Sequence, residues 1–163
     1  GLTLNALRMD DCSESMQQRV FKSMTTLNKY ACDVLKKYDV HALTDVTGFG
    51  LLVHLNEMLD DKNSAIIYKD SIPYFDDCKR YVEEFYLSGA AQTNRNSVEG
   101  KIYFDCDFFT EEILFDPQTS GGLLASVSKE DLMDIKKNFI ENNLELYVVG
   151  EVIDKNEYNV YVR

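Results

Sequence analysis

The sequence predicts an α/β or α+β domain in which helices are layered on a mixed β-sheet. Segments with the spacing of amphipathic helices alternate with short runs that are typical of strands. The 163 residues, of which 45% are hydrophobic, suit one domain with a substantial core. A turn joins the last two predicted strands, which argues against an all-parallel sheet. We therefore expect residues 1–163 to form a single domain with a mixed sheet.

The first half of the chain predicts helices and strands in turn. A capping-box pattern at Ser15–Gln18 opens a long amphipathic helix that runs to about Lys37. "VHALTDV" (40–46) predicts a strand, and "GFGLLVHLNEML" (48–59) places its leucines on one helical stripe. "SAIIYKD" (64–70) predicts the next strand. After Pro73 the pattern predicts a helix with five inward side chains, namely Phe75, Cys78, Val82, Phe85 and Tyr86.

The second half continues this alternation after a polar stretch. "LSGAAQTNRNSVEG" (87–100) predicts a long irregular loop, "FFTEEILF" (108–115) a short helix, and "GGLLASV" (121–127) a strand. Ser128–Asp131 is expected to cap a helix with Leu132, Ile135, Phe139 and Ile140 inward. "LELYVVGEV" (144–152) and "YNVYV" (158–162) flank the turn "DKNE" and predict a β-hairpin.

The composition limits the classes of partner. The net charge is −11, so a broad surface for nucleic acid is disfavoured, whereas a small phosphate ligand held with a divalent cation is compatible with it. No apolar run reaches the roughly 20 residues of a membrane span. No two of the four cysteines are closer than 20 residues, and we expect free thiols. These features predict a cytoplasmic protein without membrane or nucleic-acid partners.

A first polar cluster, "LTDVTGFG" (43–50), lies where a predicted strand meets a helix. Asp45 suits a hard oxygen ligand for Mg²⁺ beyond the strand end. The turn of Thr47, Gly48 and Gly50 would direct backbone amides at an anion. Equally, Asp45 or Thr47 is a helix N-cap and the two glycines only allow a tight turn. Spacing alone leaves both interpretations open.

A second cluster, "QTNRN" (92–96), lies in the predicted loop. Thr93, Arg95 and Asn96 offer a hydroxyl, a guanidinium and an amide, which together suit a phosphate group. An ordinary polar loop produces the same string often, and composition alone favours that alternative.

A third cluster, "DPQTSGG" (116–122), directly precedes a predicted strand. Positive φ at Gly121 and Gly122 would let consecutive amides converge on an anion. Thr119 and Ser120 would add donors, and Asp116 would bind metal or orient those donors. The alternative is a proline-started turn before a buried strand.

The histidines and cysteines give weaker indications of function than the three polar clusters do. His41 and His54 have no triad spacing, and His54 is expected to be a buried histidine with satisfied hydrogen bonds. No cysteine has a flanking base, so the sequence assigns no catalytic nucleophile.

Two of these stretches closely resemble the signature blocks of selenophosphate synthetase, also called selenide, water dikinase. They are "TDVTGFGLLVHL" (44–55) and "LFDPQTSGGLL" (114–124). "SMTTLNKYA" (23–31), "QTNRN" and "VVGEV" (148–152) resemble further segments of that family, so the likeness covers nearly the whole chain. Two departures are Val53, where the family usually has glycine, and Ala91-Gln92, which replace a glycine pair.

This resemblance implies the C-terminal domain fold of the superfamily that includes aminoimidazole ribonucleotide synthetase. It implies a homodimeric two-domain enzyme that converts ATP, selenide and water to selenophosphate, AMP and phosphate. ATP would lie between the domains with Mg²⁺ ions, one of whose ligands matches Asp45. The N-terminal ATP-binding domain, with its reactive cysteine or selenocysteine, has no match here, so this chain is expected to be inactive alone. The alternatives are a stand-alone anion- or nucleotide-binding domain, or another ATP-dependent synthetase or kinase of the superfamily.

Overall fold

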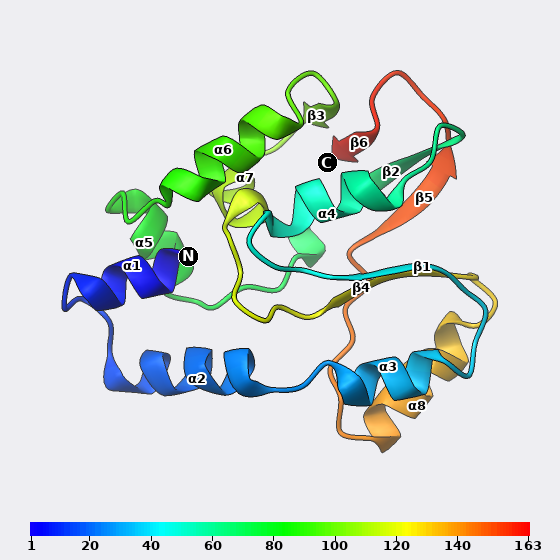
Figure 1. The fold of residues 1–163 in the computed structure, drawn as a ribbon, viewed down its shortest axis with the longest axis horizontal. Coiled ribbons are helices and arrows are strands. Elements are labelled where there is room, and N and C mark those ends of the chain that lie inside the picture. Colours follow the sequence, from blue (N-terminus) through cyan, green and yellow to red (C-terminus); the bar gives the residue numbers. More distant parts are fainter.

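The computed structural model describes residues 1–163 as alternating helices and strands, which confirms the predicted class (Figure 1). None of the helices is long and apolar enough to cross a membrane. The elements are α1 (Leu2–Arg8), α2 (Glu14–Thr25), α3 (Lys29–Leu35), β1 (Val40–Asp45), α4 (Gly50–Met58), β2 (Asn63–Ile67), a 3-10 turn (Lys69–Ser71), α5 (Cys78–Glu83), α6 (Gly89–Ser97), β3 (Ile102–Phe104), α7 (Phe108–Phe115), β4 (Leu123–Val127), α8 (Leu132–Glu141), β5 (Gly150–Asp154) and β6 (Val160–Val162).

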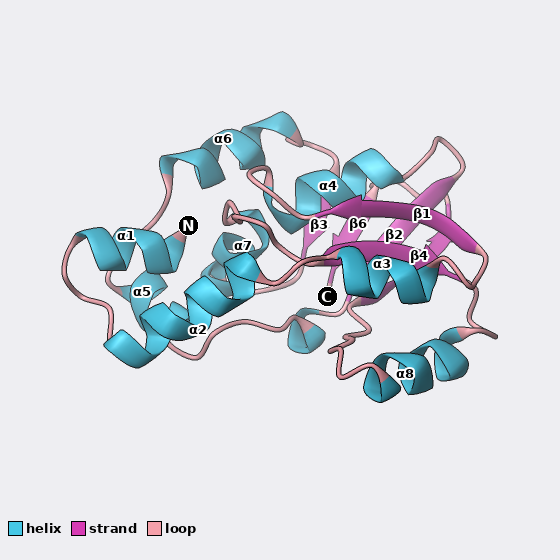
Figure 2. Cartoon of the chain, turned by 60° about the horizontal axis from the view of Figure 1, so that its bottom comes forward, coloured by secondary structure: helices cyan, strands magenta, loops and turns pink.

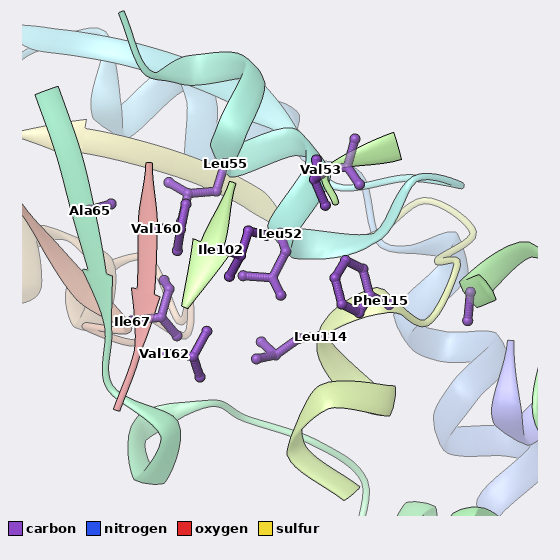
Figure 3. Close-up of a cluster of buried hydrophobic side chains, with 12 residues drawn as sticks. Leu52, Val53, Leu55, Ala65, Ile67, Ile102, Leu114, Phe115, Val160 and Val162 are labelled. Atoms are coloured by element: carbon purple, nitrogen blue, oxygen red, sulfur yellow. The ribbon is translucent and has the colours of Figure 1, made fainter. Parts of the chain in front are cut away.

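The main sheet has four strands in the order β3–β6–β2–β5. β2 is parallel to β6 and antiparallel to β5, and β3 is parallel to β6, so the sheet is mixed as predicted. Side chains of α4, α6 and α7 pack with those of β2, β3 and β6 (Figure 3). This largest core consists of Leu52, Val53, Leu55, Ala65, Ile67, Ala91, Val98, Ile102, Leu114, Phe115, Val160 and Val162.

The predicted C-terminal hairpin is wrong, because β2 lies between β5 and β6. The fully buried Ser64 hydroxyl donates to the Tyr158 carbonyl at 2.7 Å and accepts from the Asn156 amide at 3.0 Å. These bonds hold the β5–β6 loop at the beginning of β2. A Cβ at Gly150 would lie 2.0 Å from the Ile66 carbonyl oxygen, so β5 approaches β2 closely. Long-range pairing with β2 therefore replaces the local hairpin.

A separate two-stranded ribbon joins β1 to β4 in antiparallel register. Helices α3 and α8 lie side by side near this ribbon in both views (Figures 1 and 2). Their buried side chains Val34, Leu35, Ile135 and Phe139 form a core against the two strands. The ribbon thus has its own helical support, while α1, α2 and α5 lie at the opposite end of the molecule (Figure 2).

The long helix predicted for residues 15–37 is broken into α2 and α3. Hydroxyls of Thr25 and Thr26 donate to the carbonyls of Phe21 and Lys22 at 2.8 and 2.7 Å, and Thr26 has an extended backbone. Such back-bonding favours a helix end. The N-cap is Ser13 and not a residue of the predicted box, since its side chain accepts from the Met16 amide.

The loop predicted for residues 87–100 is wrong, because most of it forms α6. Ser88 caps this helix by accepting from the Ala90 amide at 3.2 Å. The helix is not apparent from the sequence, because most of its surface is polar. Its narrow buried face consists of Ala91, Asn94 and Val98.

Smaller differences concern single elements. The sequence missed α1, which packs its Leu2 and Ala6 against α5, and it missed strand β3. Two residues predicted to point inward are exposed, Phe85 at 75% and Ile140 at 74%. Phe85 lies beyond the end of α5, where its φ of 60° turns the chain away from the helical face. The four cysteines are free, as predicted.

Candidate functional site

The first and third polar clusters lie against each other where the β1–β4 ribbon ends. Asp45 is the last residue of β1 and pairs with Leu123. Beyond it, Val46 donates to the Gly122 carbonyl and accepts from the Gly121 amide, both at 3.0 Å. The backbone amide of Gln118 donates to the Thr47 carbonyl at 3.0 Å. Two stretches some 70 residues apart in sequence are therefore held side by side by backbone hydrogen bonds.

The turn of the third cluster differs from its prediction. The residue with positive φ is Ser120, at 49°, and neither Gly121 nor Gly122 has a positive φ. Gly121 is needed for another reason, since a Cβ there would lie 2.3 Å from the Val46 carbonyl oxygen. Its amide is used in pairing, so an anion nest at the two glycines is not formed. The amides of Thr119, Ser120 and Gly122 make no hydrogen bond within the chain and remain available as donors.

The Asp116 carboxylate forms hydrogen bonds within the protein and is not free for a ligand. Its two oxygens accept from the Leu2 amide at 3.0 and 3.2 Å, which places the carboxylate at the start of α1. Burial raises the pKa of Asp116, and the hydrogen bond from the Leu2 amide opposes that rise. Asp116 therefore anchors α1 to the turn.

The Asp45 side chain is exposed at the edge of an open depression of about 420 Å³. Asn28, Lys29 and Cys32 of the α3 region line the other side. The Asn28 amide donates to the Gly121 carbonyl at 2.8 Å and so fixes the start of α3 to the turn. No three histidine, cysteine, aspartate or glutamate side chains are grouped to hold a metal. Asp45 is thus a single outward carboxylate.

The turn that leads into α4 is held by glycine geometry. Gly50 has a φ of 74°, and a Cβ there would lie 2.8 Å from the Phe115 carbonyl oxygen. Its amide donates to the Thr47 carbonyl at 3.0 Å and is not free for an anion. The N-cap of α4 is Phe49 without a side-chain cap, so neither Asp45 nor Thr47 caps the helix. Gly48 has no heavy atom within 4 Å of its Cβ position.

Asn94 joins the second cluster to the other two, and the sequence interpretation missed it. This buried amide donates to the Gly48 carbonyl at 3.0 Å and to the Phe115 carbonyl at 3.1 Å. It links α6 to the turn before α4 and to the end of α7. The spacing of Ala91, Asn94 and Val98 on one helical face was the available signal, and the loop assignment concealed it.

The other polar residues of α6 face different partners. The Arg95 guanidinium lies 2.7 Å from the buried Glu112 and stacks 5.0 Å above the Phe115 ring. It is therefore engaged by the protein. Thr93 is exposed and borders a hollow of about 300 Å³ between α4 and α6, and Asn96 accepts from Gln92 at 2.8 Å. These three residues do not reach the Asp45 depression.

His54 is buried and hydrogen-bonded, as the sequence predicted, but its partners were not foreseen. Its Nε2 lies 3.2 Å from the Thr47 hydroxyl, and its Nδ1 lies 3.3 Å from a Glu57 carboxylate oxygen. The Phe49 ring lies 5.8 Å from the imidazole, centroid to centroid. A polar chain therefore runs from the turn beside Asp45 to the surface of α4.

These features define an α/β domain that presents a strand-end carboxylate beside a serine- and glycine-rich turn. The family model described as "AIR synthase related protein, C-terminal domain" matches residues 2–163. The chain belongs to this family.

Three proteins that are similar to this chain in sequence carry the same name. The chain is 41% identical over 164 residues to the selenide, water dikinase of Agathobacter rectalis, covering 99% of the chain and 48% of that protein. It is 34% identical to the selenide, water dikinase of Desulfitobacterium hafniense, covering 98% and 47% respectively. The same-named protein of Campylobacter jejuni is 31% identical over 99% of the chain and 47% of its own length. The chain spans about half the length of the curated relatives it matches.

Proposed function

We propose that this chain is the C-terminal part of an ATP-dependent selenophosphate synthetase. The full-length enzyme would convert ATP, selenide and water to selenophosphate, AMP and phosphate. This chain would supply one Mg²⁺ ligand and one wall of the ATP cleft. The remaining half would be the N-terminal ATP-binding domain, and the enzyme would be a cytoplasmic homodimer. The name and length of the relatives support this proposal.

The observation that carries the proposal is the meeting of the two signature-like stretches. Pairing of Val46 with Gly121 and Gly122 brings the Asp45 strand end against the turn. An outward carboxylate and unbonded backbone amides would then be offered to one ligand. Carboxylate oxygen suits a divalent cation, and amides suit phosphate oxygens. A cation–phosphate ligand needs both kinds of group.

The residues of this surface fit Mg²⁺ as a partial donor set. Asp45 is a hard oxygen donor, but no group of three metal-binding side chains surrounds it. Mg²⁺ prefers six oxygen ligands and takes several from substrate and water. When bound, the ion would neutralise charge that develops on the transferred phosphoryl group. The task of this chain is to hold one carboxylate oxygen and to orient amide donors.

The amides of Thr119, Ser120 and Gly122 would donate to phosphate or product. Their positions depend on Gly121, whose close approach to Val46 fixes the turn on the ribbon. Asp116 would act through the start of α1 and not through the ligand. The turn is thus prepared before ligand binds, which favours phosphoryl transfer through positioning.

A phosphate role for Thr93, Arg95 and Asn96 stays a prediction. Arg95 would have to leave Glu112 to bind a phosphate. In the arrangement described, it holds α6 against α7 instead, and that contact places Asn94 on the turn before α4.

The test uses the full-length protein that contains this chain. We expect selenide-dependent formation of AMP, and we expect Asp45→Ala to raise the Mg²⁺ requirement about tenfold or more. Asp39→Ala is the matched control, because Asp39 is an exposed aspartate just before the other end of β1. Unchanged Mg²⁺-dependent turnover in Asp45→Ala would remove that residue from the metal site. ATP consumption that does not depend on selenide would contradict the reaction.

The isolated 163-residue chain is expected to show no ATPase activity and only weak metal binding, because it offers a single carboxylate. Calorimetry with ATP and Mg²⁺ measures this directly. Tight binding by the isolated chain would instead support a stand-alone nucleotide-binding domain.

A further inference from the structure

The hollow between α4 and α6 is a second concave site, apart from the Asp45 depression. Its volume of about 300 Å³ lies at the lower end of the pockets that bind small molecules. The two sites share no lining residue. The chemistry of the hollow can therefore be considered independently of Mg²⁺ and ATP.

The two helices that form the walls run in the same direction along the hollow (Figure 1). At one end, the Asn94 side chain donates to the Gly48 carbonyl at 3.0 Å and so places the middle of α6 beside the start of α4. At the other end, Asn159 joins the two walls. Its backbone amide donates to the Lys101 carbonyl at 2.8 Å, and its side chain donates to Asn56 Oδ1 at 2.8 Å. Lys101 and the end of α4 therefore lie at the same end of the hollow.

This end carries one positive and one negative group that do not neutralise each other. Lys101 is exposed and lines the hollow together with Glu57, but the two side chains form no salt bridge. Glu57 Oε2 lies 3.3 Å from His54 Nδ1, which leaves Oε1 free to accept. Asn56 uses its oxygen for Asn159, so its NH₂ group can still donate. The charged end thus offers donors for a carboxylate and an acceptor for an ammonium group.

The remainder of the hollow is apolar or only accepts hydrogen bonds. Val53 and Val98 are buried in its walls, and the Phe49 ring, which is 56% exposed, borders the far end. The hydroxyls of Thr93 and Ser97 donate to carbonyls of their own helix, at 3.4 and 2.7 Å, so they have no proton left for a ligand. This part suits an apolar side chain better than a phosphate group.

We propose that this hollow binds a free α-amino acid with an apolar side chain. The carboxylate of the ligand binds the Lys101 ammonium and the Asn56 NH₂ group, and its ammonium group binds Glu57. The ligand side chain lies between the helices and points toward Phe49. A zwitterion matches a site with one charge of each sign, whereas a phosphate dianion would be repelled by Glu57 and by the net charge of −11.

The ligand class is tested by calorimetry on the full-length protein with L-phenylalanine. We expect a dissociation constant on the order of 1 mM, because both charged groups are exposed to water. L-Phenylalaninamide lacks the carboxylate, and N-acetyl-L-phenylalanine lacks the ammonium group. Each should bind about fivefold more weakly or worse. Equal affinity for all three compounds would contradict recognition of a zwitterion.

The location is tested with variants of exposed lining residues, which should fold normally. Lys101→Met and Glu57→Gln should each weaken binding of L-phenylalanine about fivefold. Lys101→Met should leave the affinity for L-phenylalaninamide nearly unchanged, because that compound already lacks the group that Lys101 binds. Phe49→Ala should weaken L-phenylalanine severalfold. Lys62→Met and Glu99→Gln are the matched controls, because both residues are exposed and neither lines the hollow.

Two results would overturn the proposal. One is the absence of binding to the full-length protein at about 20 mM L-phenylalanine, which is the result expected if another part of that protein covers the hollow. The other is binding that none of the three lining variants weakens, which would place the ligand elsewhere. Neither result bears on the proposed function, which is tested through Asp45 and Mg²⁺.

Discussion

Asn94 offers the sharpest test of how the three polar clusters are held together. It is buried, and its amide donates to the carbonyls of Gly48 and Phe115 at 3.0 and 3.1 Å. Replacement by alanine removes both bonds and leaves two carbonyl oxygens without a partner. At about 1 kcal/mol for each bond, plus the penalty for unmet acceptors, we expect a loss of about 2–3 kcal/mol in the free energy of unfolding. For a chain of this size, the melting temperature should fall by about 4–12 °C.

The assay is thermal and urea denaturation of the 163-residue chain, followed by circular dichroism. Asn96→Ala is the matched control, because Asn96 is exposed on the same helix and accepts only from Gln92. Asn94→Asp keeps the shape but turns the donor into an acceptor that faces two carbonyls, so it should destabilise at least as much as alanine. If Asn94→Ala costs no more than Asn96→Ala, the buried amide does not join α6 to the turn.

Two further predictions concern local backbone geometry and charge. Gly50→Ala should destabilise the fold by more than about 1 kcal/mol, since positive φ is strained for alanine and its Cβ would meet the Phe115 carbonyl; Gly48→Ala, with open space, should be nearly neutral in the same denaturation assay. Asp107 caps α7 by accepting from the Thr110 amide at 2.8 Å, and hydrogen bonding with the side chain and then the amide of Thr110 lowers the pKa of the carboxyl. Because the folded pKa is the lower one, the cap contributes above the unfolded pKa and is lost as pH falls through the folded value. Asp107→Ala should therefore cost about 1 kcal/mol at neutral pH, and a stability difference from wild type that persists unchanged well below pH of about 4 would contradict this.

The sequence was informative where a structural element depends on its own residues. The strand at residues 40–46 and the helix at 48–59 follow from local periodicity, and the structure places both as β1 and α4. The same holds for β4 and α7. Free cysteines and a buried His54 also follow from local character.

Elements whose form depends on distant partners were missed. The segment of α6 is polar along most of its surface. The burial of Ala91 and Val98 and the contacts of Asn94 and Arg95 with distant parts of the chain show why it is ordered. The hairpin failed because Ser64, far away in sequence, holds the loop that joins β5 and β6. No local pattern encodes the position of β2 between them.

In the candidate site, too, some features follow from local residues and others depend on distant partners. Asp45 and the turn at residues 116–122 could be singled out by residue type, and strand pairing explains why they meet. Which groups are free could not be foreseen, because it depends on pairing partners. The Gly121 amide is used by Val46, and the Asp116 carboxylate is used by Leu2. The Thr47–His54–Glu57 chain needed the helical geometry of α4 to become visible.

The position of β2 has a consequence for how the protein is made. β2 is synthesised long before β5 and β6, which are its neighbours on either side, and β3 joins the sheet only through β6. On the ribosome, therefore, β2 and β3 emerge as unpaired strands with apolar side chains, and neither finds its partner until residues 150–162 have left the exit tunnel. Chains dominated by such distant pairings fold slowly and expose strand edges while they wait. Strand β6 thus completes the sheet by pairing with both β2 and β3, and we expect nascent chains that still lack it to expose these strand edges.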